Sequence, residues 1–281
     1  MAPPSEFREY PVLITGCSSG IGKATVISLK TRGYAVVASA RQQQDVDDLI
    51  ASGQQAVRLD LADKRSIVDG WEQTMALTGG RLYALVNNGA YGQPGAVEDL
   101  SDAALREQFE ANFFGTHALT LLALPALRQA RGRLIQISSI LGLVSLRYRG
   151  AYSASKYALE ALSDALRLEL QGSGVRVVLI EPGAIQTRFR ANALAAFRRH
   201  IHPEHSHYKA EYHATMQRLS RETEIRYSLP AESVAQTVIR TLEHPSPRPR
   251  YRVTRSAMLL ALFKRWLPDR WMDGVSQRLG A

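Results

Sequence analysis

Long hydrophobic runs and cysteine are scarce in this 281-residue chain. No stretch approaches the roughly 20 apolar residues that a membrane-spanning helix needs, and the longest apolar run of the tail covers only residues 257–263. Cys17 is the only cysteine, so no internal disulfide can form, which fits a reducing compartment. The first nine residues hold one Arg and no apolar core region. We therefore expect no secretory signal and a cytoplasmic location.

Acidic residues are outnumbered, with 26 Asp and Glu against 35 Lys and Arg, and the formal net charge is +9. Residues 240–281 hold nine of the basic residues and only three acidic ones, a net of +6. Such a tail can meet the phosphates of nucleic acid or lipid, although a solvated face or an arginine-rich coding bias gives the same count. Because no nucleic-acid reading motif accompanies it, we expect no nucleic-acid partner.

Short β-branched runs alternate with helix-like stretches along the chain, with no repeat, low-complexity tract or interdomain linker. This alternation predicts one doubly wound Rossmann-type α/β domain over residues 1–281, with helices on both faces of a seven-stranded, mostly parallel sheet. The ligand crevice is expected at the carboxyl ends of the strands. The predicted strands cover 11–15, 35–40, 55–59, 82–87, 132–138, 175–181 and 250–254. The predicted helices cover 21–32, 45–52, 64–78, 101–130, 151–171 and 231–243.

Residues 188–229 break this rhythm, and we expect a strand-free insertion that forms a substrate lid over the crevice. Five of the seven histidines fall within residues 200–213, which would suit a zinc site. However, the segment has no cysteine and no H-x-x-x-H on a convincing helix. We therefore expect exposed histidines on a mobile lid and no functional metal.

A glycine-rich turn, TGCSSGIGKA, follows the first predicted strand directly. Gly16, Gly20 and Gly22 would let a phosphate approach bare backbone at a helix N-terminus. The spacing is a variant of the G-x-G-x-x-G dinucleotide fingerprint, and many glycine-rich turns are only tight turns. Cys17 lies in this loop with no nearby base, so we interpret it as a small filler.

The end of the second predicted strand lacks an acidic residue. An enzyme that prefers the non-phosphorylated cofactor needs one there to bind the ribose 2′-hydroxyl, but Ser39, Ala40 and Arg41 occupy the place. Arg41 can instead bind a 2′-phosphate through charge-assisted hydrogen bonds, and an exposed loop arginine is the alternative. The sequence therefore predicts NADP (NADPH) as cofactor.

Tyr152 and Lys156 stand four residues apart at the start of the helix predicted over 151–171. Residues i and i+4 share a helix face, so the phenol and the ammonium can converge. Two half-buried, snorkelling side chains are the alternative, and the pair alone does not decide between them. Apolar residues recur along this helix at 3.6-residue spacing: Tyr157, Ala158, Ala161, Leu162, Ala165, Leu166 and Leu168.

Taken together, these segments resemble the short-chain dehydrogenase/reductase family. T-G-x-x-x-G-x-G occurs at residues 15–22, Y-x-x-x-K at Tyr152 and Lys156, and P-G-x-x-x-T in PGAIQT. Ser139 precedes Tyr152 by 13 residues, and Asn112 in ANFFG matches the family's helix asparagine. The motifs run in order over residues 12–187. One departure is NNGA at 87–90, where the family has N-N-A-G, and the resemblance is strongest to hydroxysteroid and retinol dehydrogenase-like members.

The resemblance implies roles for four catalytic residues. Tyr152 exchanges a proton with the substrate oxygen, and Ser139, rather than Ser138, hydrogen-bonds the same oxygen. Lys156 holds the nicotinamide ribose and, with the positive nicotinamide, lowers the pKa of the phenol. Asn112 holds a water that links Lys156 to solvent.

The resemblance also implies a cofactor site without a metal. Asp60 would lie against adenine, and the Ile185 backbone and Thr187 would meet the nicotinamide carboxamide. The implied cofactor-binding residues are Thr15, Gly16, Ser18, Ser19, Gly20, Ile21, Gly22, Arg41, Asp60, Leu61, Asn87, Gly89, Tyr152, Lys156, Pro182, Gly183, Ile185 and Thr187.

These features predict an NADP(H)-dependent oxidoreductase acting on a lipophilic carbonyl or alcohol of the steroid, retinoid or long-chain aldehyde type. The candidate pocket residues are mostly apolar or aromatic: Tyr91, Leu141, Val144, Tyr148 and the 188–229 lid. A dinucleotide-binding sensor without turnover is the alternative, although a sensor would not need the Ser139–Tyr152–Lys156 set.

The long helices near 101–130 and 151–171 are Ala- and Leu-rich, and relatives commonly pair these helices across a two-fold axis. We therefore expect a homodimer or homotetramer. The alternative is that these residues serve only the internal sheet.

Residues 255–281 form an amphipathic extension. Lys264 and Arg265 lie on one face of its first helix, which Pro268 ends, and Trp271, Met272 and Val275 continue the apolar pattern. We expect the apolar face to pack against the protein's own body or a partner subunit. An interfacial helix on anionic lipid, giving peripheral membrane contact, is the alternative. The apolar face comprises Met258, Leu259, Leu262, Phe263, Trp266 and Leu267.

Overall fold

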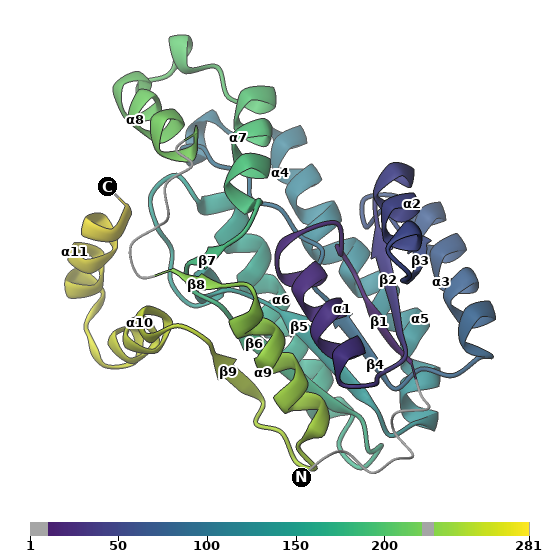
Figure 1. The fold of residues 1–281 in the computed structure, drawn as a ribbon. Helices are drawn as coiled ribbons and strands as arrows, with labels where there is room; N and C mark the ends of the chain where they lie inside the picture. The colour runs from purple at the N-terminus through teal and green to yellow at the C-terminus, as the bar shows by residue number, and fades with distance from the viewer. Residues whose placement is uncertain (1–10, 221–227, 281) are drawn as a thin grey trace.

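A seven-stranded parallel sheet forms the centre of the protein in a computed structural model that describes residues 11–220 and 228–280 (Figure 1). The strand order is β3-β2-β1-β4-β5-β6-β9, and every neighbouring pair is parallel. The order reverses between β1 and β4, which creates the switch point where such sheets bind ligands. The strands are β1 (Val12–Ile14), β2 (Val36–Ala40), β3 (Gln55–Arg58), β4 (Ala84–Asn87), β5 (Arg133–Ile137), β6 (Arg176–Glu181) and β9 (Arg250–Arg252).

The sheet is covered on both faces, as its apolar strands require. All residues of β1, β2, β4 and β5 are buried, which is typical of parallel strands between two helical layers. Successive residues of β1 point to opposite faces: Val12 and Ile14 join one core, and Leu13 joins the other. The predicted fold class, a doubly wound Rossmann-type α/β domain, is confirmed.

Helices α1 (Gly20–Thr31), α2 (Gln43–Ala51) and α9 (Glu232–Glu243) pack on the first face, and their buried residues belong to the first core. Helices α3 (Lys64–Thr78), α5 (Gly115–Gln129) and α6 (Gly150–Glu169) cover the other face (Figure 1). The long helix expected over 101–130 is interrupted. Helix α4 (Asp102–Phe109) runs into a π-helical turn, Glu110–Phe114, before α5 begins. Such turns often accompany functional sites because they re-aim a side chain.

The region over the carboxyl ends of the strands consists of α7 (Phe189–His200) and α8 (Lys209–Ser220), which stand above the sheet in Figure 1. Our expectation that residues 188–229 hold no strand is wrong at the last residue. The two-residue strand β8 (Leu229–Pro230) starts there and pairs in parallel with β7 (Ile185–Gln186). The part of this region at 221–227 lies outside the described residues.

The C-terminal extension forms two short helices, α10 (Arg255–Trp266) and α11 (Asp269–Gly280), beyond the β9 edge of the sheet (Figure 1). Thr254 caps α10 by accepting a hydrogen bond from the Ala257 N–H at 3.1 Å, and Pro268 separates the two helices as predicted. Over the described residues, every helix falls short of the length and apolar character needed to cross a bilayer.

Candidate active site

The turn between β1 and α1 has no room for side chains at two of its glycines. A Cβ atom on Gly22 would lie 2.2 Å from the Gly16 carbonyl oxygen, and one on Gly16 would lie 2.8 Å from Gly89 Cα. Gly16 and Gly20 also have positive φ angles, of 70° and 55°. Ser19, the N-cap of α1, makes no side-chain capping bond, and the first turn of the helix holds no acidic residue. The N–H groups at this end are therefore available to an anion.

Two residues after β4 hold the glycine turn in place. The Thr15 hydroxyl accepts hydrogen bonds from the Asn88 and Gly89 N–H groups, both at 2.9 Å. The Asn88 side-chain amide donates to the Thr15 carbonyl at 2.8 Å and to the Gly16 carbonyl at 3.1 Å. Sequence reasoning missed Asn88, although it adjoins the predicted Asn87. Asn87 instead donates its amide to the Thr120 hydroxyl at 2.9 Å.

Gly89 stands where the family's N-N-A-G has alanine, and it lies close to two side chains. A Cβ atom on Gly89 would lie 3.0 Å from Leu61 Cδ1 and 3.3 Å from the Thr15 hydroxyl oxygen. An alanine here would therefore require Leu61, which is buried, to shift by a few tenths of an ångström.

Arg41 is exposed just after β2 and has a second guanidinium beside it. The Arg58 Nε donates to the Arg41 carbonyl at 3.3 Å, and Ala40 pairs with Arg58 across the two strands. Arg58 was not predicted, because only the register of β2 and β3 brings it to Arg41. Asp60 follows β3, and its carboxylate accepts from the Ala62 N–H at 3.0 Å.

The PGAIQT segment lies against the glycine turn. A Cβ on Gly20 would lie 3.0 Å from Thr187 Cβ, so these two distant motifs lie side by side. The Thr187 hydroxyl accepts from the Phe189 N–H at 3.2 Å, which starts α7. The Pro182 carbonyl accepts from the Ile140 N–H at 2.9 Å and thereby joins this segment to the loop that carries Ser139. A Cβ on Gly183 would lie 2.1 Å from the Thr254 hydroxyl oxygen.

Ser139, Tyr152 and Lys156 meet at the carboxyl end of β5. Tyr152 and Lys156 lie in the first two turns of α6, and Ser139 follows β5 in the adjoining loop. The Lys156 ammonium donates to the Ile137 carbonyl at 2.8 Å and lies 5.9 Å from the centre of the Tyr152 ring. The serine hydroxyl accepts from the Leu141 N–H at 3.1 Å. Asn112, the fourth candidate catalytic residue, lies on the neighbouring π turn.

The electrostatics of Tyr152 differ from our expectation. Burial raises its pKa to about 12, while a hydrogen bond with Ser139 and the charge of Arg149 act in the lowering direction. Lys156 is not among the groups that lower this pKa. The Lys156 ammonium is itself buried, which lowers the Lys156 pKa to about 8, and it donates to a backbone carbonyl.

Asn112 holds the loop after β4. Its side chain accepts from the Tyr91 N–H at 3.1 Å and donates to the Tyr91 carbonyl at 2.9 Å and to the Ser155 hydroxyl at 3.3 Å. Gln108, one turn earlier, donates to the same carbonyl at 2.9 Å and accepts from the Gln93 N–H at 2.6 Å. Gln108 of α4 and Asn112 of the π turn thus direct two amides at one loop, and the water expected at Asn112 stays a prediction.

A buried ionic cluster lies behind Lys156, and sequence reasoning missed it. Glu160, one turn after Lys156, and Glu181, at the end of β6, are both buried. Arg250 of β9 pairs with Glu160 at 3.2 Å, with Glu181 at 3.1 Å and with Asp164 at 2.6 Å, and Arg252 pairs with Glu181 at 3.0 Å. Burial raises the pKa of Glu160 to about 7, with the Glu181 charge adding to the rise and Arg250 opposing it.

The expected pocket residues divide between two apolar clusters. Leu141 and Val144 pack with Ala257, Ala261 and Met272 of the C-terminal helices.

Tyr148 packs edge-on against Tyr208 and Tyr212, at centroid distances of 5.6 Å and 5.8 Å, under α8. Phe189, the second residue of the expected lid, lies beside the candidate catalytic residues, because its ring centre is 5.3 Å from that of Tyr152.

The histidines of α7 and α8 do not converge. His202, His205, His207 and His213 are exposed, and His200 contacts the Glu107 carboxylate at 2.8 Å. Within 11–220 and 228–280, no three His, Cys, Asp or Glu side chains are placed to hold a metal ion. Cys17 is buried and its pKa is raised to about 12 by burial, so the thiol is unreactive as expected.

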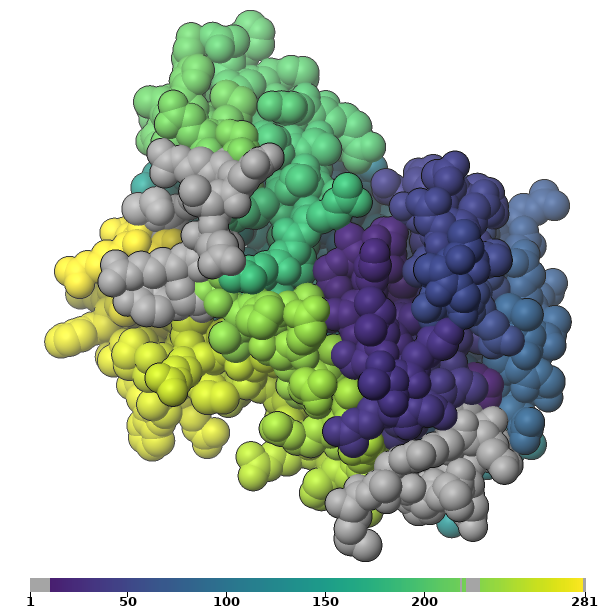
Figure 2. Space-filling model, in the orientation of Figure 1, coloured from purple at the N-terminus to yellow at the C-terminus, as the bar shows by residue number. Residues whose placement is uncertain are grey.

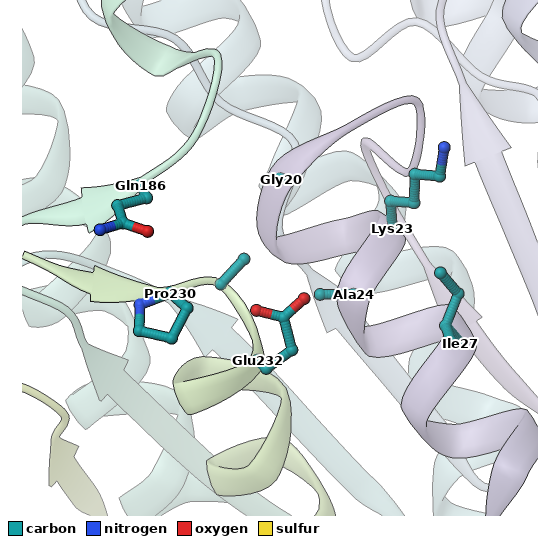
Figure 3. Close-up of a pocket in the computed structure, with 8 residues that line it drawn as sticks. Gly20, Lys23, Ala24, Ile27, Gln186, Pro230 and Glu232 are labelled. Carbon is teal, nitrogen blue, oxygen red and sulfur yellow. The ribbon is translucent and has the colours of Figure 1, made fainter. Parts of the chain in front are cut away.

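A surface hollow borders the glycine turn (Figure 3), and none of the three candidate catalytic residues lines it. It lies between the start of α1 and the start of α9, with Gly20 and Ala24 on one wall and Pro230 and Glu232 on the other. Figure 3 shows the Glu232 carboxylate pointing toward α1. Gly20 is the one predicted cofactor-binding residue that lines the hollow.

Comparison with known proteins gives consistent matches. A family model described as short chain dehydrogenase matches residues 11–196. The uncharacterized oxidoreductase YbbO of Escherichia coli K12 is 40% identical over 267 residues, which cover 95% of this chain and 93% of that protein. Human retinol dehydrogenase 16 is 31% identical over 286 residues, with 96% and 89% covered. The crystal structure of a short-chain dehydrogenase from Streptomyces avermitilis superposes with a TM-score of 0.72 at 27% identity, covering 94% of this chain and 97% of that one.

Proposed function

Because this chain belongs to the short-chain dehydrogenase/reductase family, as its motifs predicted, we propose that it transfers a hydride between NADP(H) and a lipophilic carbonyl or alcohol. The family membership makes it an oxidoreductase, and the similarity to retinol dehydrogenase 16 agrees with the branch that the motifs indicated. One observation carries the proposal. Ser139, Tyr152 and Lys156 meet at the carboxyl end of β5, beside a glycine turn whose N–H groups are available to an anion.

The residues at the switch point fit a nicotinamide dinucleotide. The bare glycine backbone and the uncapped N-terminus of α1 suit a pyrophosphate, and Thr187 contacts that turn from the opposite side. The cofactor, when bound, supplies or accepts the hydride. The chain's own residues do the rest. The glycine turn and Thr187 orient the cofactor, and Lys156 binds its ribose. Ser139 and Tyr152 hydrogen-bond the substrate oxygen.

The proton chemistry fits hydride transfer to a carbonyl. With a pKa of about 12, Tyr152 carries its proton at neutral pH and can donate it to an oxygen that gains negative charge. Ser139 stabilises the same developing charge through its hydroxyl. We therefore assign Tyr152 as the general acid of carbonyl reduction and, in the reverse reaction, as the general base of alcohol oxidation.

The cofactor preference for NADP(H) rests on Arg41 and is supported by Arg58. Two guanidinium groups at the end of β2 and β3, with no acidic residue at residues 39–41, favour a 2′-phosphate over a free hydroxyl. The Arg41→Ala variant should lose NADPH affinity by about tenfold or more while its NADH affinity changes little. Equal affinity of the unaltered protein for both cofactors would contradict the assignment.

The substrate class follows from the surroundings of Tyr152. The Phe189 ring packs against the phenol, and a Cβ on Gly92 would lie 2.8 Å from Phe189 Cζ. Leu141 and Val144 are apolar neighbours in the same region. An apolar wall beside the general acid favours steroids, retinoids or long-chain aldehydes.

The direct test follows NADPH consumption by the purified protein with a panel of such carbonyls against small polar sugars and hydroxy acids. The Tyr152→Phe variant should lose turnover by about a thousandfold, because the general acid is gone, and should still bind NADPH. Turnover of the polar set alone would contradict the substrate class. Activity that survives in Tyr152→Phe would contradict the mechanism, and cofactor binding without any turnover would favour the sensor alternative.

The homodimer or homotetramer proposal is supported by the outer faces of α5 and α6. The apolar stripe predicted on α6 points partly to solvent, while Ser153, Ser155, Lys156 and Glu160 are on its buried face. Leu121, Tyr157 and Leu168 are exposed on these two helices. A second copy is the natural cover for such a surface. A monomer mass by light scattering, unchanged on dilution, would contradict it.

A further inference from the structure

Large apolar side chains point outward from the two C-terminal helices. The exposed set, which we call the tail surface, comprises Met258, Leu259, Leu262, Phe263, Trp266, Trp271 and Leu279. Trp266 and Trp271 are 73% and 71% exposed, which is unusual for tryptophan in a folded protein. In Figure 2 the C-terminal helices form a yellow lobe at one edge of the molecule.

Helix α10 has small apolar residues on its inner side and large ones on its outer side, whereas an ordinary surface helix buries its large apolar residues. Its inward positions are Ala257 and Ala261, which pack with Ile140, Leu141 and Val144. The five larger apolar residues of α10 in the tail surface lie on the opposite side of the helix. We expected this face to pack against the protein's own body or a partner subunit, and the first of these is wrong. Small residues inward and large residues outward indicate that something outside the chain covers the tail surface.

The charges around the tail surface identify its partner. Residues 255–280 hold five basic residues, Arg255, Lys264, Arg265, Arg270 and Arg278, against Asp269 and Asp273, which leaves a net charge of +3. Lys264 lies 3.4 Å from Asp269, whereas the four arginines have no ion-pair partner among the residues that the structure describes. Exposed Trp next to unpaired Arg suits the boundary between acyl chains and anionic headgroups.

We propose that the tail surface binds the interfacial region of an anionic lipid membrane. The helices that carry the tail surface lie beside the candidate active site, because Ala257, Ala261 and Met272 on their inner sides belong to one apolar cluster with Leu141, which follows Ser139 by two residues. Membrane binding would thus bring the site close to the phase in which lipophilic carbonyls partition. The binding itself does not depend on the proposed reaction.

A second copy of the chain is a poorer partner for this surface. Two tail surfaces meeting across a two-fold axis would bring a net charge of +3 against +3, which opposes association. A separate exposed apolar stripe, on α5 and α6, is available for pairing of subunits. Anionic lipid supplies both the apolar phase and the opposite charge.

The test is flotation of the full chain with vesicles of equimolar phosphatidylcholine and phosphatidylglycerol, and with vesicles of phosphatidylcholine alone. We expect binding to the anionic vesicles at low salt, weaker binding at high salt and little binding to the neutral vesicles. The double variant Trp266→Ser/Trp271→Ser should lose binding at least tenfold. Val97→Ser removes a similarly exposed apolar side chain outside the tail surface and should bind as the unaltered protein does.

Two further measurements separate the mechanisms of binding. Replacing Arg265 and Arg270 by Gln should weaken vesicle binding about fivefold per charge removed. In variants that retain only Trp266 or only Trp71, brominated lipid should quench Trp266 and leave Trp71, which packs in the core on the α3 side, unchanged.

Absence of binding at low salt would overturn the proposal, and so would unchanged binding in the double tryptophan variant. If that variant instead changes the molecular mass by light scattering, the tail surface is a subunit interface and the proposal is also overturned. NADPH consumption with a water-soluble carbonyl reports on the proposed reaction separately, since it does not require vesicles.

Discussion

The glycine turn and the corner around Tyr152 lie at the carboxyl edge of one sheet, yet they are built from different kinds of groups. The turn is held by uncharged groups: the Thr15 hydroxyl, the Asn88 amide and backbone carbonyls. The corner contains three of the four buried charged residues that the structure describes, Lys156, Glu160 and Glu181. The turn therefore depends on close packing of uncharged groups, and the corner depends on buried charges.

Because of this difference, substitutions in the glycine turn and in the corner around Tyr152 should affect stability and activity differently. Close-packed backbone tolerates no added atom, because the neighbouring carbonyls cannot move away. Buried charges cost folding free energy, and they persist where function needs a proton or a fixed cation. We therefore expect substitutions in the turn to lower stability and cofactor binding together. Substitutions in the corner should separate activity from stability.

The sharpest test of this comparison is Lys156→Met. Turnover should fall by about a thousandfold, since ribose binding and proton transfer lose their cation. Stability should move the other way. The Lys156 pKa is about 8, below the ordinary value of a lysine, so the folded state disfavours the ammonium below pH 8 and this cost disappears as pH rises past the ordinary value. The free energy of unfolding at pH 7 should rise by about 2 kcal/mol, measured by urea denaturation.

Lys64→Met is the matched control for that experiment, because Lys64 is exposed at the start of α3. It should change neither turnover nor stability by more than a small amount. A Lys156→Met protein that is clearly less stable than the unaltered one at pH 7 would show that the corner contributes stability, contrary to the comparison.

Gly22→Ala should have the largest effect in the turn. Its Cβ would meet the Gly16 carbonyl oxygen at 2.2 Å and the Asn88 amide nitrogen at 2.7 Å. We expect NADPH affinity to fall about a hundredfold and the free energy of unfolding to drop by about 2–3 kcal/mol, by fluorescence titration and urea denaturation. Gly274→Ala in α11, where nothing lies within 4 Å of the new Cβ, should be neutral or stabilising by about 0.5–1 kcal/mol. If the two variants changed NADPH affinity and the free energy of unfolding equally, close packing of the turn would not be what it depends on.

Asn112→Asp tests the hydrogen bonds that join the loop after β4 to helix α6, between the glycine turn and the corner around Tyr152. The carboxylate still accepts from the Tyr91 N–H but can no longer donate to the Tyr91 carbonyl or to Ser155. We expect a loss of about 2 kcal/mol in stability and about tenfold in kcat/KM, measured on the same preparation. Asn192→Asp, at an exposed position of α7, is the control and should leave both quantities unchanged. Full activity in Asn112→Asp would remove Asn112 from the site.

Glu160→Gln should have the smallest effect on turnover at neutral pH and the clearest one in the pH profile of turnover. Glu160 is the charge that raises the Lys156 pKa, so its removal should move the alkaline limb of kcat/KM to lower pH. The Glu160 pKa of about 7 is above the ordinary value, so its contribution to stability is present at acidic pH and is lost as pH rises through 7.

Glu160→Gln should therefore gain stability relative to the unaltered protein above about pH 5, and the gain should reach its full value of ~3 kcal/mol at most above pH 7. Glu169→Gln, exposed on the same helix, provides the matched control. An alkaline limb that stays in place would show that Glu160 supports only Arg250 and not Lys156.

Local spacing in the sequence determined the elements and the reactive pairs. Alternating runs predicted the βα order, the glycine spacing predicted the turn, and the four-residue separation placed Tyr152 and Lys156 on one helix. The residues involved are neighbours in the chain, so backbone geometry alone sets their relation. Ordered motifs then extended the prediction to Ser139 and Thr187.

Only the tertiary structure decided which surfaces are covered and which distant groups meet. Periodicity marks an apolar stripe on α6 and on α10 but does not say whether the sheet lies against that stripe. The stripe of α10 faces outward, and that of α6 points partly to solvent. The contacts of Asn88 with Thr15 and of Glu160 with Arg250 span 73 and 90 residues. Strand order and register bring such pairs together, and these arise from packing of the whole chain rather than from the spacing within any one segment.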